Sequence, residues 1–245
     1  MILSKQKTGI IIQARMGSTR LPEKIMMPIK NKPIFDYQLK RLGTLSYPVF
    51  IATTTKSSDD IVEKFAEERG LPCFRGDENN VLSRYYHCAK EHKLENIVRL
   101  TSDCPLIDAD IIEQGISMYF AQNDVNTYVS NTLDRTYPRG ADFEVFSFKQ
   151  LEIAFEQAVD PVDQEHVTPY IWKNKSGMTK VVQIKNVEDF SAFRLTLDTR
   201  EDLKLISKLI EQYNADRLSM DEICGILTLY PELPAINHHI EQKKV

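Results

Sequence analysis

The sequence predicts an α/β fold, an open and mostly parallel β-sheet with helices on both faces. Strand-like and helix-like segments alternate along most of the 245 residues, a pattern typical of parallel sheets with crossover helices. The run GIIIQA at 9–14 is almost continuously apolar, as in strands that are buried on both faces. With 42% hydrophobic residues, the chain can bury one large core. We therefore expect a single domain over 1–245.

In the first half of the chain, apolar runs and helical spacing alternate regularly. The helix expected at 57–70 begins with acidic residues and ends at Gly70, as stable helices commonly do. Strands are expected at GIIIQA (9–14), VFIATT (49–54), LPCFRG (71–76) and ENIVRLTSD (95–103), and helices at FDYQLKRLGTL (35–45), SSDDIVEKFAEERG (57–70), VLSRYYHCAKEHK (81–93) and ADIIEQGISMYFAQ (109–122). Ligands of such sheets bind beyond the carboxyl ends of the strands.

The second half is less regular between residues 124 and 177, where we expect a small inserted lobe. Its expected elements are strands TYVSN (127–131) and DFEVFS (142–147) and helices FKQLEIAFEQA (148–158) and QEHVTPYIWKN (164–174). The alternation then resumes with strands TKVVQIK (179–185) and FRLTLD (193–198) and helix EDLKLISKLIEQYN (201–214), which Thr199 introduces. A last helix opens with a capping box from Ser219 to Glu222.

Charge and cysteine usage exclude several classes of protein. The net charge of −4 and the pI near 5.8 argue against a general nucleic-acid binder, which needs a basic face. Residues 1–45 nevertheless hold nine basic side chains against two acidic ones. The four cysteines form no CxxC pair, so neither a zinc site nor a disulfide framework is predicted. No signal peptide and no apolar run of about 20 residues is present, so we expect a cytoplasmic protein without membrane contact.

The positive charge near the N-terminus is concentrated in ARMGSTRLPEK, the loop that follows the first expected strand. Arg15, Arg20 and Lys24 repel one another unless an anion lies among them. Gly17 and Ser18 favour a turn whose backbone amides form a concave anion site. The loop matches neither the Walker pattern nor the GxGxxG dinucleotide pattern. It predicts a phosphate site, and the alternative is a solvated loop with incidental charges.

Two aspartates extend this prediction to a metal ion. Asp103 ends the expected strand at 95–103, and Asp198 ends the expected strand at 193–198. Both carboxylates should then lie at the sheet edge that carries the cationic loop. Because Mg²⁺ is usually held by one or two carboxylates together with substrate phosphates, the set fits a nucleoside triphosphate with Mg²⁺. Each aspartate could instead cap the helix that follows it.

Six stretches of the chain together resemble a known family. They are IIQARMGSTRLPEK, FRGDENNVLSRYY, RLTSDCPLID, YPRGADFEVFS, QEHVTPY and RLTLDTREDL, in order from Gly9 to about Leu205. They are similar to the SpsF-type spore coat polysaccharide family, a branch that is similar to the cytidylyltransferases that make CMP-sialic acids and CMP-Kdo. The resemblance implies a glycosyltransferase-A-like nucleotidyltransferase fold, CTP, Mg²⁺, and transfer of a nucleoside monophosphate to a sugar acceptor with release of pyrophosphate. It also implies a homodimer formed through residues 124–177.

The resemblance assigns roles to particular positions. It implies Arg15, Lys24, Asp103 and Asp198 as catalytic residues, with the two aspartates as Mg²⁺ ligands. It implies that the nucleotide is bound by Gln13, Ala14, Arg15, Gly17, Ser18, Arg20, Lys24, Arg75, Gly76, Arg84 and Ser102, and the acceptor by Arg139, Asp142, Glu144, Glu165 and His166. His166 is either a general base or a structural histidine. The chain departs from the family at Glu23, where glycine is common, and at Gln164, where arginine is common.

Three functional hypotheses follow. The leading one is a cytidylyltransferase that activates a nonulosonate-like sugar acid or a related sugar, with GTP or UTP as other possible nucleotides. The second is a glycosyltransferase of the same fold that uses a nucleotide sugar, although the three cations suit a triphosphate better. The third is a catalytically silent assembly subunit, which a broken cationic loop or a lost aspartate would favour. Only the first predicts pyrophosphate release.

Overall fold

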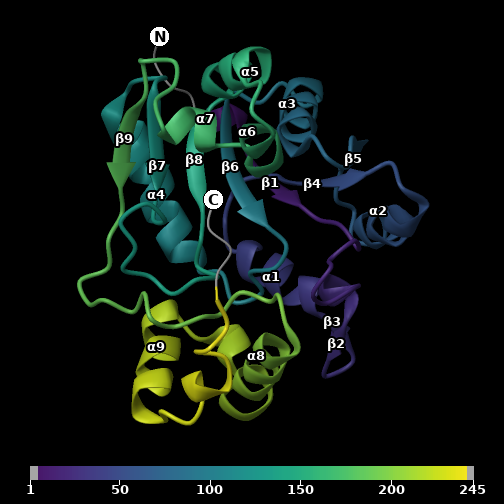
Figure 1. The fold of residues 1–245 in the computed structure, drawn as a ribbon, viewed down its shortest axis with the longest axis vertical. Helices are drawn as coiled ribbons and strands as arrows, with labels where there is room; N and C mark the ends of the chain where they lie inside the picture. The colour runs from purple at the N-terminus through teal and green to yellow at the C-terminus, as the bar shows by residue number, and fades with distance from the viewer. Residues whose placement is uncertain (1–4, 242–245) are drawn as a thin grey trace.

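A seven-stranded sheet organises the computed structural model, which describes residues 5–241 (Figure 1). The strand order is β5-β4-β1-β6-β8-β7-β9, and β8 runs antiparallel to both neighbours while the other pairs are parallel. The strands are β1 (Thr8–Gln13), β4 (Val49–Thr54), β5 (Cys73–Gly76), β6 (Asn96–Thr101), β7 (Thr127–Ser130), β8 (Glu144–Ser147) and β9 (Lys180–Gln183), with a separate hairpin of β2 (Pro28–Ile29) and β3 (Lys32–Pro33). The predicted mostly parallel α/β sheet is confirmed.

Helices cover the sheet, and side chains at their first turns fix where several of them begin. Asp108 caps α4, Thr199 introduces α8 as predicted and forms a capping box with Asp202, and the capping box predicted at Ser219 introduces α9. The α-helices are α1 (Ile34–Leu42), α2 (Asp60–Glu67), α3 (Val81–Glu91), α4 (Ala109–Gln122), α5 (Phe148–Gln157), α6 (Pro161–His166), α7 (Pro169–Trp172), α8 (Arg200–Tyr213) and α9 (Met220–Leu229). Short 3₁₀ turns occur at η1 (Lys5–Lys7), η2 (Lys24–Met26), η3 (Ser57–Asp59), η4 (Ala215–Arg217) and η5 (Pro234–Ile236).

The apolar run of β1 is buried on both faces of the sheet. Ile10 and Ile12 pack into the core shared with α1, α2, α4, α8 and α9, whereas Ile11 packs into the core shared with α3, α5 and α7. All three isoleucines have no exposed surface. Because successive side chains of a strand point to opposite faces, the continuous apolar run makes β1 a central strand. Its carboxyl end is therefore held rigidly.

Two expected elements differ in the structure. FRLTLD is an extended loop, because its backbone forms hydrogen bonds with two other loops: Leu195 N–H donates to the carbonyl of Arg139 (2.6 Å) and Leu197 N–H to that of Asp103 (2.8 Å).

The expected helix at 164–174 is split into α6 and α7. Val167 has a φ of 72° there, a left-handed conformation that interrupts a helix, and Pro169 supplies no N–H to continue it.

Residues 124–177 contribute two strands, β7 and β8, to the main sheet. β8 pairs with β6, with Val145 opposite Val98, and β7 pairs with β8. The segment places β8 and β7 between β6 and the edge strand β9, and its helix α5 packs against α3 (Figure 1). Its roles in acceptor binding and dimerisation stay predictions. No helix within residues 5–241 is long and apolar enough to cross a bilayer.

Candidate active site

The carboxyl ends of β1 and β6 meet at one cavity. Gln13, the last residue of β1, lies opposite Thr101, the last residue of β6. A cavity of about 330 Å³ opens beyond them. It is lined by Gln13, Ala14, Arg15, Gly17, Ser18, Thr19, Arg20, Lys24, Arg84, Thr101, Ser102, Asp103, Glu165 and Asp198. Most of the residues implied for the nucleotide therefore lie together, with Thr19 and Thr101 added by the structure.

The cationic loop is held in one shape by buried anchors. Met16 N–H donates to Asp59 Oδ1 (2.7 Å), and Glu23 N–H donates to the carbonyl of Met16 (3.1 Å). The side chains of Met16 and Leu21 are buried. Glu23 has a φ of 59°, the left-handed region that glycine adopts without steric cost. Glu23 therefore holds a backbone conformation that a glycine would favour at this position.

Two cations at the cavity lack a carboxylate partner among residues 5–241. Arg84 is 1% exposed, and its Nη1 donates to the carbonyls of Asp77 (3.0 Å) and Glu78 (3.4 Å). Arg15 is exposed and has no such partner either. Burial lowers the pKa of Arg84, and the charge of Arg15 lowers it further. Because a buried cation without a counter-ion is costly, an anion in this cavity would stabilise both side chains.

Lys24 lies between the two candidate metal ligands. Its Nζ is 3.0 Å from Asp103 Oδ2 and 2.9 Å from Asp198 Oδ1. Arg20 Nη2 is 3.0 Å from Asp198 Oδ2. Burial alone would lower the pKa of Lys24, but the charges of the two carboxylates outweigh it and the pKa is raised. Burial likewise opposes ionisation of Asp103, yet Lys24 and a 2.6 Å hydrogen bond from Thr101 hold the pKa of Asp103 below its usual value.

The donor set fits Mg²⁺ shared with a phosphate. Asp103 and Asp198 already direct oxygens toward one cation, the ammonium of Lys24, and carboxylate oxygens are the protein ligands that Mg²⁺ favours. Among residues 5–241 no group of three or more His, Cys, Asp or Glu side chains could hold a metal. A substrate phosphate would therefore complete the coordination. The alternative of helix capping is wrong, because Asp108 caps α4 and Thr199 caps α8.

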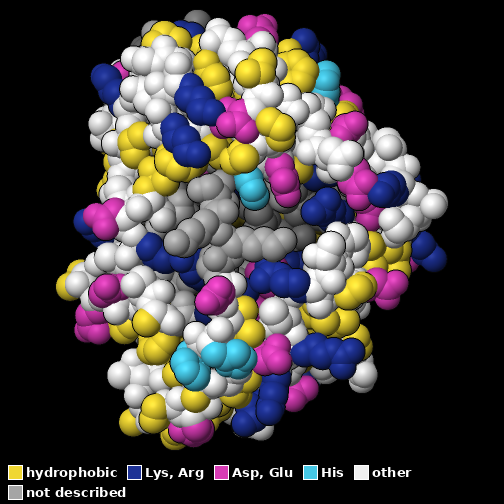
Figure 2. Space-filling model, viewed as in Figure 1, with side chains coloured by type: hydrophobic (Ala, Val, Ile, Leu, Met, Phe, Trp, Pro, Cys, Tyr) yellow, Lys and Arg dark blue, Asp and Glu magenta, His cyan; other side chains and the backbone are white. Residues whose placement is uncertain are grey.

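A second cavity of about 610 Å³ adjoins the first, and Thr101 lines both. It contains four of the five residues implied for the acceptor: Arg139, Asp142, Glu144 and His166. Glu165 lines the first cavity instead. Sequence reasoning missed Arg99, Arg135 and Trp172, which also line the second cavity. Figure 2 shows one face of the molecule, on which Lys and Arg side chains are interspersed with acidic ones.

Several acceptor-side groups are already engaged. Glu144 is buried, forms an ion pair with Arg99, and accepts hydrogen bonds from Tyr128 (2.5 Å) and Thr168 (2.6 Å). Asp142 forms a bidentate pair with Arg135, at 2.5 and 2.9 Å. These contacts indicate that Glu144 and Asp142 orient neighbouring cations.

Arg75 is the one implied nucleotide ligand whose side chain faces elsewhere. It lines neither cavity, and its guanidinium lies 2.7 Å from both Asp60 and Glu63 of α2. These acidic side chains direct it away from the site, which argues against direct nucleotide contact. Its neighbour Gly76 lies behind Arg84, where an added Cβ would come within 3.0 Å of Arg84 Cγ. Gly76 therefore allows the close approach of Arg84.

Comparison with known proteins agrees with this geometry. A family model described as "Cytidylyltransferase" matches residues 9–222. The spore coat polysaccharide biosynthesis protein SpsF of Bacillus subtilis is 35% identical over 91% of this chain and 94% of its own length. A 3-deoxy-manno-octulosonate cytidylyltransferase of Chloroherpeton thalassium is 31% identical over 45% of each chain. A solved cytidylyltransferase structure from Leptospira borgpetersenii has a TM-score of 0.88 and 33% identity, covering 97% of this chain and 99% of that one. The chain therefore belongs to the cytidylyltransferase family of nucleotidyltransferases.

Proposed function

We propose that this enzyme transfers CMP from CTP to a sugar acid, nonulosonate-like or related, with release of pyrophosphate. The observation that carries the proposal is the pair of adjoining cavities. The first cavity brings the cations Arg15, Arg84 and Lys24 together with the carboxylates of Asp103 and Asp198. The second cavity is lined by further arginines and offers separate space for an acceptor. The names of relatives support this choice, since one acts on 3-deoxy-manno-octulosonate and another serves spore coat polysaccharide synthesis.

In this proposal the acceptor oxygen attacks the α-phosphorus of CTP, the bond to pyrophosphate breaks, and the acceptor proton passes to a base or to water. Arg15, Arg20 and Arg84 hold the triphosphate and stabilise the charge that develops on it. Asp103 and Asp198 would hold Mg²⁺, which would offset negative charge on the triphosphate. Positioning and electrostatics supply the catalysis, so no covalent enzyme intermediate is required.

The acceptor side offers one cation that suits a carboxylate. Arg139 is half-buried in the second cavity and forms no ion pair among residues 5–241. Burial lowers the pKa of Arg139, and the neighbouring charges of Arg135 and Arg194 lower it further. A carboxylate there would relieve this repulsion. Gln164 donates to the carbonyl of Ala158 (3.2 Å) and lines neither cavity. We therefore assign carboxylate recognition to Arg139.

The proposal is tested by combining CTP, GTP, UTP or ATP with sugar acids or sugar 1-phosphates in the presence of Mg²⁺. Pyrophosphate release and product mass are measured. We expect pyrophosphate and a CMP-sugar from CTP and a sugar acid. Turnover of a nucleotide sugar without pyrophosphate would instead show the glycosyltransferase, and a preference for GTP or UTP would overturn the base assignment. No turnover with any pair would favour the silent subunit.

Lys24→Met provides a prediction on the metal site. Turnover should fall roughly 10² to 10³-fold, as for the loss of one preorganised charge-stabilising group. Without nucleotide, however, Mg²⁺ should raise the Tm of Lys24→Met more than that of the parent, because Lys24 Nζ no longer competes for Asp103 and Asp198. Differential scanning fluorimetry measures this shift. Lys40→Met, which removes the 3.1 Å surface pair with Asp216, is the matched control. An equal Mg²⁺ shift in parent and Lys24→Met would contradict competition at this site.

Assembly and location also remain proposals. We infer a homodimer formed through residues 124–177 and a cytoplasmic location, with CTP and a sugar as ligands and no nucleic acid. A mass of one chain at micromolar concentration in light scattering would contradict the dimer.

A further inference from the structure

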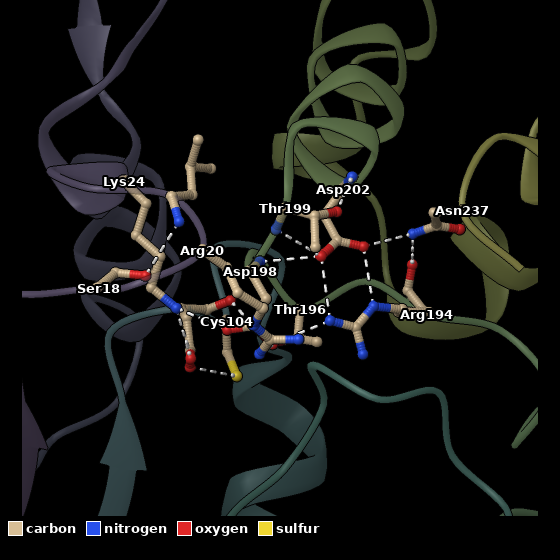
Figure 3. A network of polar contacts seen from close by, with 12 residues as sticks. Ser18, Arg20, Lys24, Cys104, Arg194, Thr196, Asp198, Thr199, Asp202 and Asn237 are labelled. Carbon is tan, nitrogen blue, oxygen red and sulfur yellow. Dashed lines mark hydrogen bonds and ion pairs between the residues drawn. The ribbon is translucent and has the colours of Figure 1, made fainter. Parts of the chain in front are cut away.

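Behind Asp198 lies a buried network that the candidate site does not use directly. We call it the support network, and it consists of Arg194, Asp202 and Asn237. Their exposed fractions are 5%, 0% and 1%. Figure 3 shows the carboxylate of Asp202 facing the guanidinium of Arg194, with the amide of Asn237 beside it. The three residues come from the loop before α8, from α8 and from the segment after η5.

Among residues 5–241, three cations contact Asp198, but they do not have the same surroundings. Lys24 and Arg20 line the first cavity, so a bound triphosphate offers both of them another anion. Arg194 Nη2 is 2.9 Å from Asp198 Oδ2 and does not line that cavity. A nucleotide therefore does not draw Arg194 away. The ability of Asp198 to bind Mg²⁺ therefore depends on how much of the carboxylate charge Arg194 neutralises.

Asp202 limits the contact between Arg194 and Asp198 to a single hydrogen bond. Arg194 Nε donates to Asp202 Oδ1 (2.9 Å) and Arg194 Nη2 to Asp202 Oδ2 (3.0 Å), which is a bidentate pair. Such a fork is the preferred arrangement of arginine with a carboxylate. Because the fork of Arg194 is directed at Asp202, its contact with Asp198 is the single hydrogen bond from Nη2 to Asp198 Oδ2. Asp198 Oδ1 then faces Lys24 and the cavity.

Other hydrogen bonds fix Asp202 itself. Its Oδ2 accepts from the backbone N–H groups of Asp198 (2.9 Å) and Thr199 (3.0 Å). Asn237 Nδ2 donates to Asp202 Oδ1 (2.8 Å) and to the carbonyl of Arg194 (3.0 Å). The amide of Asn237 thus ties the side chain of Asp202 to the backbone of Arg194.

We propose that Asp202 is a positioning residue for Mg²⁺ binding: it retains the guanidinium fork of Arg194 and so keeps Asp198 available to the metal, with Asn237 fixing Asp202. This inference rests on the proposed function, which makes Asp198 a Mg²⁺ ligand. A purely structural alternative exists, because Asp202 also completes the capping box of α8. The experiment has to separate these two roles.

Asp202→Asn separates them. Its carbonyl oxygen can still accept from Asp198 and Thr199, so the cap is kept, but its amide NH₂ then faces Arg194 Nε and Asn237 Nδ2, which are both donors. Arg194 should turn toward Asp198. We expect the Mn²⁺ dissociation constant, measured without nucleotide by electron paramagnetic resonance of free Mn²⁺, to rise roughly 10 to 100-fold, as for other lost partners of metal ligands. The Mg²⁺ concentration for half-maximal turnover should rise in parallel, while the KM for CTP at saturating Mg²⁺ stays unchanged.

Asp108→Asn is the matched control. Asp108 is 6% exposed, caps α4, accepts a 2.6 Å hydrogen bond from Met220 N–H and lies 3.7 Å from Arg41 Nη2, outside the first cavity. The Asp108→Asn variant should be less stable than the parent, but its Mn²⁺ dissociation constant should be unchanged. Asn237→Ala removes one donor and adds none, so it should weaken Mn²⁺ binding less than Asp202→Asn. If Asp202→Asn does not fold, the Mn²⁺ dissociation constant of Asn237→Ala, compared with that of Asp108→Asn, tests the positioning role instead.

The outcomes distinguish this inference from the proposed function. If Asp198→Asn weakens Mn²⁺ binding and the support-network variant behaves like Asp108→Asn, the metal site stands and the positioning role is wrong. If Asp198→Asn leaves Mn²⁺ binding unchanged, the proposed metal site itself is wrong. Weakened binding in Asp198→Asn and in the support-network variant, with Asp108→Asn unchanged, would support both.

Discussion

Asp103→Asn and Asp198→Asn should each lower turnover by about 10³-fold or more while the protein stays folded. Each substitution keeps the shape of the side chain and deletes the charge that would hold Mg²⁺. Metal stabilisation of transition-state charge contributes several kcal/mol, and each 1.36 kcal/mol is worth about tenfold in rate. Steady-state pyrophosphate release across a range of Mg²⁺ concentrations measures the loss, and circular dichroism checks the fold.

Asp216→Asn is the control for these variants. The side chain of Asp216 is 13% exposed, as is that of Asp198, and it also pairs with a lysine, Lys40. Asp216 lies outside the first cavity, so its variant should turn over like the parent. Near-normal Mg²⁺-dependent activity in Asp103→Asn or Asp198→Asn would remove that aspartate from the metal site.

The sequence predicted the parts of the site that depend on local order. Arg15, Arg20 and Lys24 lie in the loop that follows the central strand β1, and Asp103 follows the strand paired with it. Since parallel strands end at one sheet edge, alternation and loop composition were enough to bring these residues together. The α/β class followed from the same alternation.

Contacts between distant segments could not be predicted in this way. FRLTLD has the composition of a strand, but its hydrogen bonds go to loops at Arg139 and Asp103, so Asp198 reaches the site without belonging to the sheet. Arg75 is the penultimate residue of β5, near the strand end as predicted, yet Asp60 and Glu63 of α2 turn its side chain away. Nor does any local pattern link Asn237 to Asp202, because that contact requires the C-terminal segment to fold back onto α8.

Arg15→Ala should lower turnover roughly 10² to 10³-fold, by analogy with deleting one preorganised charge-stabilising donor. Arg15 lines the first cavity, is exposed and has no ion-pair partner among residues 5–241, so its removal breaks no contact that supports the fold. Its charge also lowers the pKa of Arg84, which shows that the two cations repel each other in the absence of an anion.

The melting temperature of Arg15→Ala, measured with and without nucleotide, therefore provides a second test of phosphate binding by Arg15. Without nucleotide, the variant should melt at the parent's temperature or slightly above it, because the repulsion of Arg84 is relieved. Addition of CTP with Mg²⁺ should then raise its Tm less than that of the parent, since ligand stabilisation follows affinity. Arg217→Ala removes an arginine that is 76% exposed and lies outside the first cavity, and should match the parent in both measurements. If Arg15→Ala bound CTP and turned over like the parent, ARMGSTRLPEK would not be the phosphate-binding loop, and the triphosphate would have to lie elsewhere.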